Sequence, residues 1–286
     1  MQPDHVMNIF DDIEAKMMDE ETLGFSPDVL AALDNVEASE SDIEMLKYRI
    51  SHDILFGLFH IAGSVYYGSI QKGSIHTFSE VITRLGMHHA KAMIIMLAMH
   101  ILSKKDEAIE TVFARSFASS VIGRILAHQV GMREEAVKNV ELGCLFSEIG
   151  RMILLIYKKL HAPDDPRIDE NFIDQYHVYL TERIIDTFSL PDYLKTMLFH
   201  EGVVVEGPYI TASGLVRLAV QFVSACFSRH RNHLIIEPVA APSGQDESIS
   251  LAHIIEDQFR AVGLEKYLMI VKKIDRLLPA RQSEKS

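Results

Sequence analysis

The sequence has few cysteines, no long apolar run and a deficit of basic residues. Its two cysteines, Cys144 and Cys226, lie in apolar surroundings without a CxxC spacing, so we expect two buried thiols in a reducing compartment. The most apolar stretch, residues 92–102, is interrupted by His100. It is shorter than the ~20 apolar residues needed to cross a bilayer, which predicts a buried helix and no membrane contact.

Basic residues are outnumbered, with 28 lysines and arginines against 40 acidic residues and a formal net charge of −12. Such a surface repels phosphate backbones, so nucleic acid is not an expected partner. The densest basic cluster, residues 229–233, has no interleaved aromatic residues, and we interpret it as a solvated helix end. The acidic N-terminus lacks the pattern of a signal peptide, which predicts a cytoplasmic protein.

Proline is absent between Asp28 and Ala162, and apolar residues there recur at helical rather than alternating spacing. This pattern predicts an all-α fold. A long helix that contains Phe113, Phe117 and Val121 on one face is expected to be central. Small residues on the same segment, including Gly123, would let a neighbouring helix approach closely.

Local signals mark where the preceding helices begin and end. Thr77 and Glu80 form a T-x-x-E capping box that predicts a helix start, and Gly86 predicts a stop or a tight junction. The next helix, residues 87–103, is rich in methionine, which indicates either adaptable core packing or a groove for a partner. The pair His88 and His89 opens this helix, and we interpret it as a surface feature rather than a metal site.

Several motifs occur in a characteristic order. The element Ile61–Gly68 reads IAGSVYYG, and Thr77–Gly86 reads TFSEVITRLG. Further along come Phe113-Ala114-Arg115-Ser116, Leu145-Phe146-Ser147-Glu148-Ile149-Gly150, His177, Leu190-Pro191 and His200. In this order the motifs resemble those of the HDOD domain, an all-helical bacterial signalling module related to the HD phosphohydrolases.

The resemblance implies a particular domain organisation. We expect an N-terminal helical lobe over residues 26–105 and an HD-like helical lobe over residues 106–232. An acidic segment, residues 1–25, would precede them. A linker at residues 233–248, of which residues 237–248 carry the linker composition, would lead to C-terminal helices at 249–286.

The HD-like motifs depart from an enzyme's pattern. An HD phosphohydrolase needs imidazoles and carboxylates that converge on a divalent metal, because the cation generates a hydroxide nucleophile and neutralises the phosphoryl oxygens. Here Arg115 stands at the first histidine position, Ser147-Glu148 replaces the His-Asp pair, and the late aspartate falls near Val220. These replacements predict a degenerate site with no metal, no cofactor and no catalytic activity.

Some potential ligands remain. His177, His200 and Glu148 could in principle hold zinc, although buried, hydrogen-bonded histidines are the simpler interpretation. His200-Glu201-Gly202 followed by Gly207-Pro208-Tyr209 is similar to a stretch of the HD-GYP phosphodiesterases, but its order differs and chance explains it better.

Three hypotheses for function follow. The first is a non-catalytic signalling or regulatory module that acts by binding a protein partner, with a homodimer also allowed. The second is a residual metal-dependent phosphohydrolase or cyclic-dinucleotide phosphodiesterase. The third is a sensor in which the remodelled pocket, formed by the degenerate HD positions, binds a small anion through Arg115. Similarity to the family suggests a role in signalling, but it does not identify a pathway.

The C-terminal segment carries apolar residues that must be covered. We expect two helices there, at residues 249–262 and 264–278, with apolar faces that include Ile255, Phe259 and Leu264. The short linker would hold this segment near the HD-like lobe, so intramolecular docking is predicted. A dimer interface is the alternative.

Overall fold

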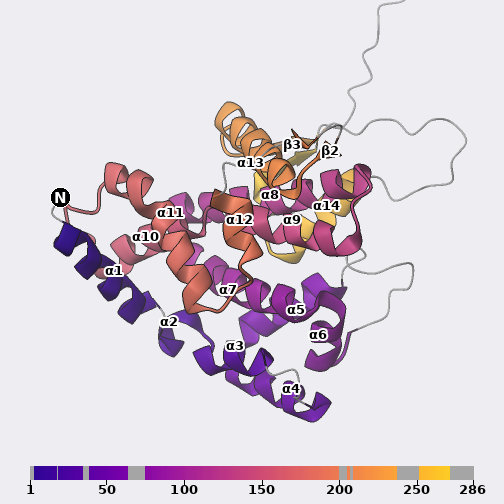
Figure 1. Cartoon of the computed structure of the whole chain (residues 1–286), viewed down its shortest axis with the longest axis horizontal. Coiled ribbons are helices and arrows are strands. Elements are labelled where there is room, and N and C mark those ends of the chain that lie inside the picture. Colours follow the sequence, from indigo (N-terminus) through magenta and orange to yellow (C-terminus); the bar gives the residue numbers. More distant parts are fainter. Residues whose placement is uncertain are drawn as a thin grey trace, which may run out of the picture.

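Helices dominate the computed structural model, which describes residues 3–17, 19–34, 39–63, 75–199, 205–206, 209–236 and 251–270. Within these ranges, β-structure is limited to two two-stranded sheets of short strands and one isolated bridge between Phe25 and Ile50. The all-α prediction is therefore confirmed. The helices form two stacked lobes, with the N-terminal lobe at the bottom of Figure 1 and the HD-like lobe above it.

Within the N-terminal lobe, helix α6 (Phe78–Leu85) begins where the local capping signal predicts. Thr77 accepts a hydrogen bond from the backbone N–H of Glu80, whose carboxylate accepts one from the N–H of Thr77, so the capping box is confirmed. Gly86 has a φ of 85°, which lets the chain turn sharply between two helices. The lobe comprises α3 (Pro27–Leu33), α4 (Glu40–Leu46), the 3₁₀ turn η1 (Lys47–Arg49), α5 (His52–Gly63), α6 (Phe78–Leu85) and α7 (Met87–Ser103).

Helix α7 lies in the core between the lobes. Every residue from His89 to His100 is buried, including Met93, Met96 and Met99, so the methionines serve core packing and not a partner groove. His88 is exposed, but His89 is buried, and the surface interpretation was wrong for His89. In the described part of the chain no single helix is long and apolar enough to cross a membrane; α6 and α7 pass that test only as a pair bent by 111°.

The HD-like lobe is built around α8, as the sequence predicts. Helix α8 packs against α7, α9, α10 and α13. A Cβ atom at Gly123 would lie 2.6 Å from the sulfur of Cys144, which confirms the close approach of a neighbouring helix. Cys144 is buried, but Cys226 is only half-buried, and both are free thiols. The lobe comprises α8 (Glu107–Gln129), α9 (Glu134–Phe146), α10 (Ile149–His161), α11 (Glu170–Thr187), α12 (Tyr193–Phe199) and α13 (Ala212–Arg229).

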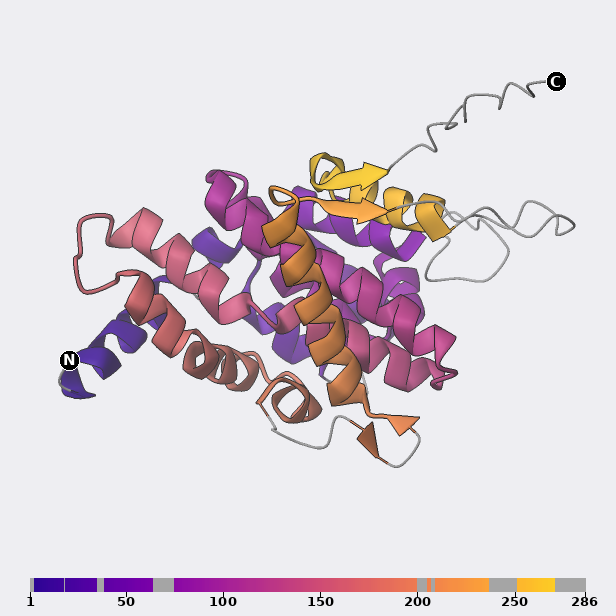
Figure 2. The same cartoon turned by 90° about the horizontal axis from the view of Figure 1, so that it is seen from above.

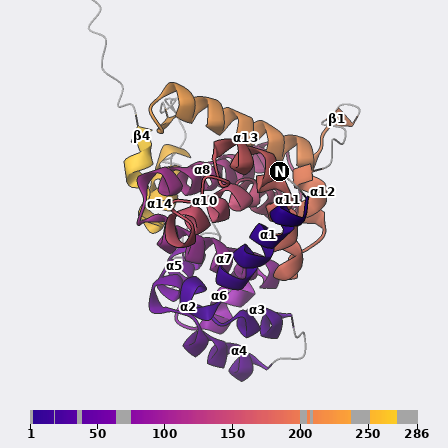
Figure 3. The ribbon, with the colours of Figure 1, turned by 90° about the vertical axis from the view of Figure 1, so that its left-hand side faces the viewer.

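The acidic N-terminal segment forms helices that pack on the HD-like lobe. Helix α1 (Pro3–Met17) lies beside α10 and α11 (Figure 3), and α2 (Glu20–Leu23) follows it. Phe10 is buried and contacts the rings of Phe172 and Tyr176 on α11. The guanidinium Nε of Arg183 donates to Glu14 at 2.6 Å. Residues before the HDOD-like motifs therefore contribute to the core.

A buried lysine joins the two lobes. The side chain of Lys91 on α7 is 1% exposed, and its Nζ donates to both carboxylate oxygens of Asp34 at 2.8 and 2.7 Å. It also donates to the carbonyl of Ser189 at 3.2 Å. Ser189 follows α11 with a φ of 48°, so Lys91 ties the end of α3 to a strained turn at the end of α11.

The C-terminal segment differs from the sequence prediction. Helix α14 (Leu251–Ala261) matches the first expected helix, but residues 264–270 do not form the expected second α-helix, and residues 271–278 lie outside the described residues. They form the 3₁₀ turn η3 (Glu265–Tyr267) and strand β4 (Leu268–Ile270), which pairs in parallel with β3 (Leu234–Ile236), as Figure 2 shows. Residues 234–236 of the expected linker are thus a strand. The other sheet is β1 (Val205–Glu206) with β2 (Tyr209–Ile210).

This segment docks onto the rest of the chain, as predicted. The ring of Phe259 packs edge-on against Phe117 on α8 at a centroid distance of 5.5 Å. Near the end of the segment, the hydroxyl of Tyr267 donates to Glu110 at 3.2 Å. The Nε2 of His100 lies 2.7 Å from the carbonyl of Val262, so the docking surface includes α7 as well as the HD-like lobe.

Candidate functional site

The degenerate HD positions meet where α8 passes the junction of α9 and α10. Arg115 on α8 donates through Nη2 to Glu148 Oε2 at 2.7 Å. Glu148 lies at the break between α9 and α10, and the Nε of Arg151 approaches the same oxygen at 3.3 Å. Both Arg115 and Glu148 are largely buried. The carboxylate therefore already faces two guanidinium groups, which offset its charge.

The charged network continues onto α11. Arg151 also forms an ion pair with Asp174, one helical turn before His177. Burial lowers the pKa of His177, Arg151 lowers it further, and Glu148 opposes the shift. The imidazole is consequently neutral at pH 7. Its Nδ1 is buried and has no hydrogen-bond partner among the residues that the structure describes.

Ser147 has a local structural role. Its hydroxyl donates to the carbonyl of Cys144 at 2.7 Å, in the last turn of α9. The same carbonyl also accepts a hydrogen bond from the backbone N–H of Ser147 at 3.3 Å, so the hydroxyl adds a second hydrogen bond at the helix end. Ser147 thus caps the C-terminal end of α9. It does so at the position where an HD enzyme has a metal-binding histidine.

Helices α10 and α11 approach each other unusually closely at Gly150. A Cβ atom there would lie 1.9 Å from the carbonyl oxygen of His177 and 2.6 Å from Thr181 Oγ1. The N–H of Gly150 donates to Thr181 Oγ1 at 3.1 Å, and that hydroxyl donates to the His177 carbonyl at 2.8 Å. This contact sets the position of His177 relative to Glu148.

A pocket of about 290 Å³ opens beside this network. Ser147, Glu148 and His177 line its polar end. The remaining wall is formed by α12 and α13 together with one residue of α11: Val178, Met197, Leu198, Phe199, Val216, Arg217, Val220 and Gln221. Val220, at the expected aspartate position, thus faces the pocket with an apolar side chain.

The structure brings together Arg115, Ser147, Glu148 and His177, whereas His200 and Glu201 lie outside the described residues. Among the described residues, no group of three or more histidine, cysteine, aspartate or glutamate side chains is arranged to hold a metal ion. The polar side chains at this site do not fit a divalent cation either, because the Arg115 guanidinium is paired with the Glu148 carboxylate that a cation would need as a ligand.

Sequence reasoning missed two members of the network, Arg151 and Asp174. A spacing signal was present for both. Arg151 follows Glu148 by three residues and Asp174 precedes His177 by three, a separation that places side chains on one helix face. The lining residues Arg217 and Gln221 had no comparable signal, because only the tertiary fold brings α13 to the pocket.

Comparison with known proteins agrees with this geometry. A model of the HDOD domain family matches residues 23–197. The chain belongs to the HDOD domain family. The match covers α3 to α11 and most of α12, including every element that carries the Arg115–Glu148–His177 cluster. A search of curated proteins found no match to this HDOD protein.

Two solved structures are similar to this chain, and the likeness to the first supports the fold. A protein described as a candidate metal-dependent phosphohydrolase from Shewanella amazonensis SB2B is 12% identical, with a TM-score of 0.55 over 91% of this chain and 96% of that one. An HDOD domain protein of unknown function from Geobacter sulfurreducens is 14% identical, with a TM-score of 0.45 over 91% and 88%. At these identities the likeness concerns the fold alone.

Proposed function

We propose that this HDOD protein is a non-catalytic bacterial regulatory module that acts in signal transduction by binding a protein partner. The observation that carries the proposal is the ion pair of Arg115 with Glu148 at 2.7 Å. Hydrolysis at an HD site requires a cation that lowers the pKa of bound water. A fixed guanidinium supplies positive charge at that place but cannot bind or activate a water as a metal does.

The charge balance of the network also argues against a residual metal site. Arg115 and Arg151 already compensate Glu148, and Arg151 also pairs with Asp174. A divalent ion would have to displace a guanidinium from a largely buried carboxylate. This supports a structural role for the old catalytic residues, so a residual phosphohydrolase is the weaker candidate.

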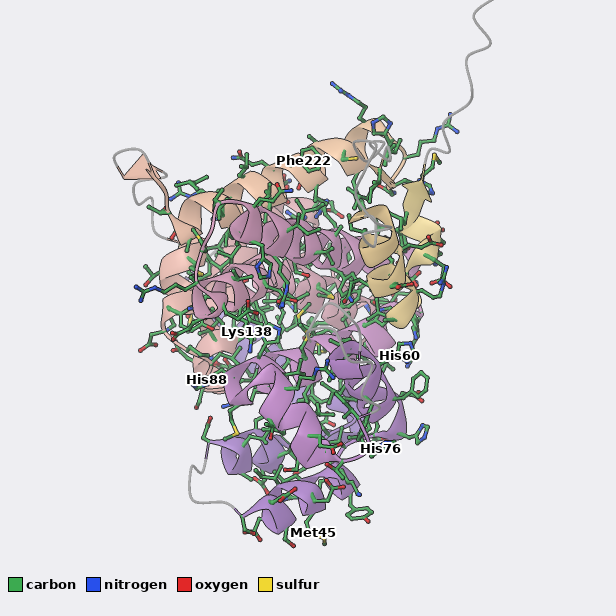
Figure 4. All side chains as sticks on the ribbon, turned by 90° about the vertical axis from the view of Figure 1, so that its right-hand side faces the viewer. Met45, His60, His76, His88, Lys138 and Phe222 are labelled. Atoms are coloured by element: carbon green, nitrogen blue, oxygen red, sulfur yellow. The ribbon has the colours of Figure 1, made fainter. Side chains whose placement is uncertain are left out.

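Exposed apolar side chains offer contact points for a partner. Leu218 and Phe222 lie four residues apart on the outer face of α13, and Phe222 is 53% exposed. Met45 and Tyr48 are exposed near the end of the N-terminal lobe, with Tyr48 at 73%. Phe222 and Met45 lie at opposite ends of the molecule (Figure 4), so they test two separate surfaces. Large exposed apolar residues that adjoin one another are typical of interaction sites.

Affinity capture from the source cells with charge-introducing variants tests the proposal. The wild-type chain should retain a partner in stoichiometric amount. Either the double variant Leu218→Glu with Phe222→Glu or the double variant Met45→Glu with Tyr48→Glu should lose it, while the circular dichroism spectrum stays unchanged. Retention of no partner by the wild-type chain, together with metal-dependent turnover of a phosphodiester, would contradict the proposal.

A further inference from the structure

The outer face of α13 carries an apolar stripe that none of the described residues covers. Leu218, Phe222 and Ala225 are exposed, with Leu218 at 47% and Phe222 at 53%. Their spacing of four and then three residues places them on one side of the helix. Figure 3 shows α13 along the edge of the HD-like lobe, on the side away from the N-terminal lobe. These three residues form the α13 seam, which faces outward.

The seam ends in positive charge. Arg229 follows Ala225 by four residues, so it lies on the line of the seam at the C-terminal end of α13. Arg231 lies two residues further on, and both arginines are exposed. Neither guanidinium has an ion pair within the part of the chain that the structure describes. No acidic residue occurs at positions 207–236, in a chain that has 40 acidic residues and a net charge of −12.

The spacing of the seam fits a helix of a partner. Apolar residues at alternating steps of three and four pack against another helix, whose side chains fill the spaces between them. From Leu218 to Arg229 the helix rises by about 16 Å, so a partner helix of about three turns covers it. Such a helix must present apolar side chains to the seam and carboxylates to the two arginines, because complementary charges stabilise and orient an interface.

A second copy of α13 does not meet this requirement. Antiparallel pairing would place Arg229 of one copy beside Leu218 of the other, and parallel pairing would place the two Arg229 side chains together. Helix α13 has no acidic residue, so neither arrangement supplies a carboxylate from the facing helix. Like charges across an interface weaken it. The charge pattern therefore favours a different protein as the occupant.

We propose that the outer face of α13 binds an acidic amphipathic helix of the protein partner, whose apolar side packs on the α13 seam and whose carboxylates pair with Arg229 and Arg231. This inference rests on the proposed partner binding and specifies the chemistry of the partner. Helix α13 lies beyond residues 23–197 of the family match. The site is thus on a helix outside the matched HDOD region.

Two synthetic peptides test the charge preference. The acidic peptide repeats the seven residues Leu-Glu-Ala-Leu-Ala-Glu-Glu three times, and the basic peptide has lysine in place of each glutamate. Binding of each labelled peptide to the full chain is measured by fluorescence anisotropy at low salt. The acidic peptide should bind at least about tenfold more tightly, because its carboxylates meet the two arginines. The net charge of −12 favours the opposite order, so this result would locate binding at a basic site.

Three variants locate the binding on α13. Phe222→Ala should weaken binding of the acidic peptide at least about tenfold, because a central aromatic contact is lost. Arg229→Gln should weaken it about threefold, as expected for an exposed ion pair. Arg133→Gln, which removes an exposed arginine at the start of α9, should leave the affinity unchanged. Tighter or equal binding of the basic peptide would overturn the inference, as would equal effects of Arg229→Gln and Arg133→Gln.

A photocrosslink identifies the natural occupant. p-Benzoylphenylalanine replaces Phe222 in one full-length chain and Met45, at the opposite end of the molecule (Figure 4), in another. Each chain is irradiated in the source cells. At position 222 the crosslinked segment should have an amphipathic helical pattern and a negative net charge. A crosslink there to nucleic acid, lipid, a second copy of this chain or a basic segment would overturn the inference.

The second position separates this inference from the proposed function. A protein partner crosslinked only at position 45 would overturn the α13 site and leave the proposed function standing. No protein crosslinked at either position would contradict both.

Discussion

Gly150→Ala is the substitution for which the structure predicts the largest effect from one methyl group. The added Cβ would lie 1.9 Å from the carbonyl oxygen of His177 and 2.6 Å from Thr181 Oγ1. Neither neighbour is the flexible end of a long side chain, because one is backbone and the other is held by a hydrogen bond to that backbone. Helices α10 and α11 must therefore separate by roughly 1.5 Å before ordinary contact distances return.

The expected destabilisation combines three effects. Overpacking of a well-filled contact costs about 1–3 kcal/mol. Losing the hydrogen bond from Gly150 to Thr181 adds about 1 kcal/mol. The higher helix propensity of alanine offsets about 1 kcal/mol of this loss in the free energy of unfolding. We expect the free energy of unfolding to fall by about 1–3 kcal/mol, and the positions of Glu148 and His177 to change with the helix separation.

Urea unfolding followed by circular dichroism at 222 nm measures this change. Gly63→Ala is the matched control, because a Cβ at the end of α5 meets nothing within 4 Å. That variant should be neutral or more stable by up to about 1 kcal/mol. If Gly150→Ala and Gly63→Ala unfolded at the same urea concentration, the close approach of α10 and α11 would be refuted.

Three further predictions concern the core. Phe259→Ala should lower the free energy of unfolding by about 3–5 kcal/mol in urea unfolding, because a fully buried ring is lost. Burial lowers the pKa of His100 to about 4, so stability is full above pH 6.5 and should fall by about 3 kcal/mol as the pH drops from about 6.5 to about 4. The stability curve of His100→Gln against pH should lack that component. Lys91→Ala should destabilise by about 2 kcal/mol, because the Ser189 carbonyl and the partly exposed carboxylate of Asp34 lose their hydrogen bonds to Lys91. Lys104→Ala at the solvated end of α7 should change the melting temperature little.

Local signals in the sequence were sufficient for much of the helical fold. The Thr77–Glu80 capping box and the turn at Gly86 depend on residues a few positions apart, and both were predicted correctly. Strand β4 was not. Leu268, Met269 and Ile270 fit an apolar helix face as well as a buried strand, and their partner β3 lies 34 residues earlier. Only tertiary pairing decides between the two.

Part of the candidate site was predictable, because the order of the motifs assigns their residues to neighbouring helices of the HD-like lobe. Arg115 and Glu148 were expected at one site, and they form a direct ion pair. The unsatisfied Nδ1 of His177 was not foreseen, since burial and hydrogen bonding are properties of the assembled fold. For the same reason the sequence did not distinguish the exposed His88 from the buried His89.

The central claim is that the Arg115 guanidinium replaces a metal ion at the degenerate HD site. The direct measurement is the metal content of the purified chain after incubation with Mn²⁺, Fe²⁺ and Zn²⁺ and removal of free ions, together with hydrolysis of bis(p-nitrophenyl) phosphate and of cyclic dinucleotides. We predict no stoichiometric metal and no turnover. One or two ions per chain, roughly the number that metal hydrolases hold, with turnover abolished by His177→Ala, would contradict the account.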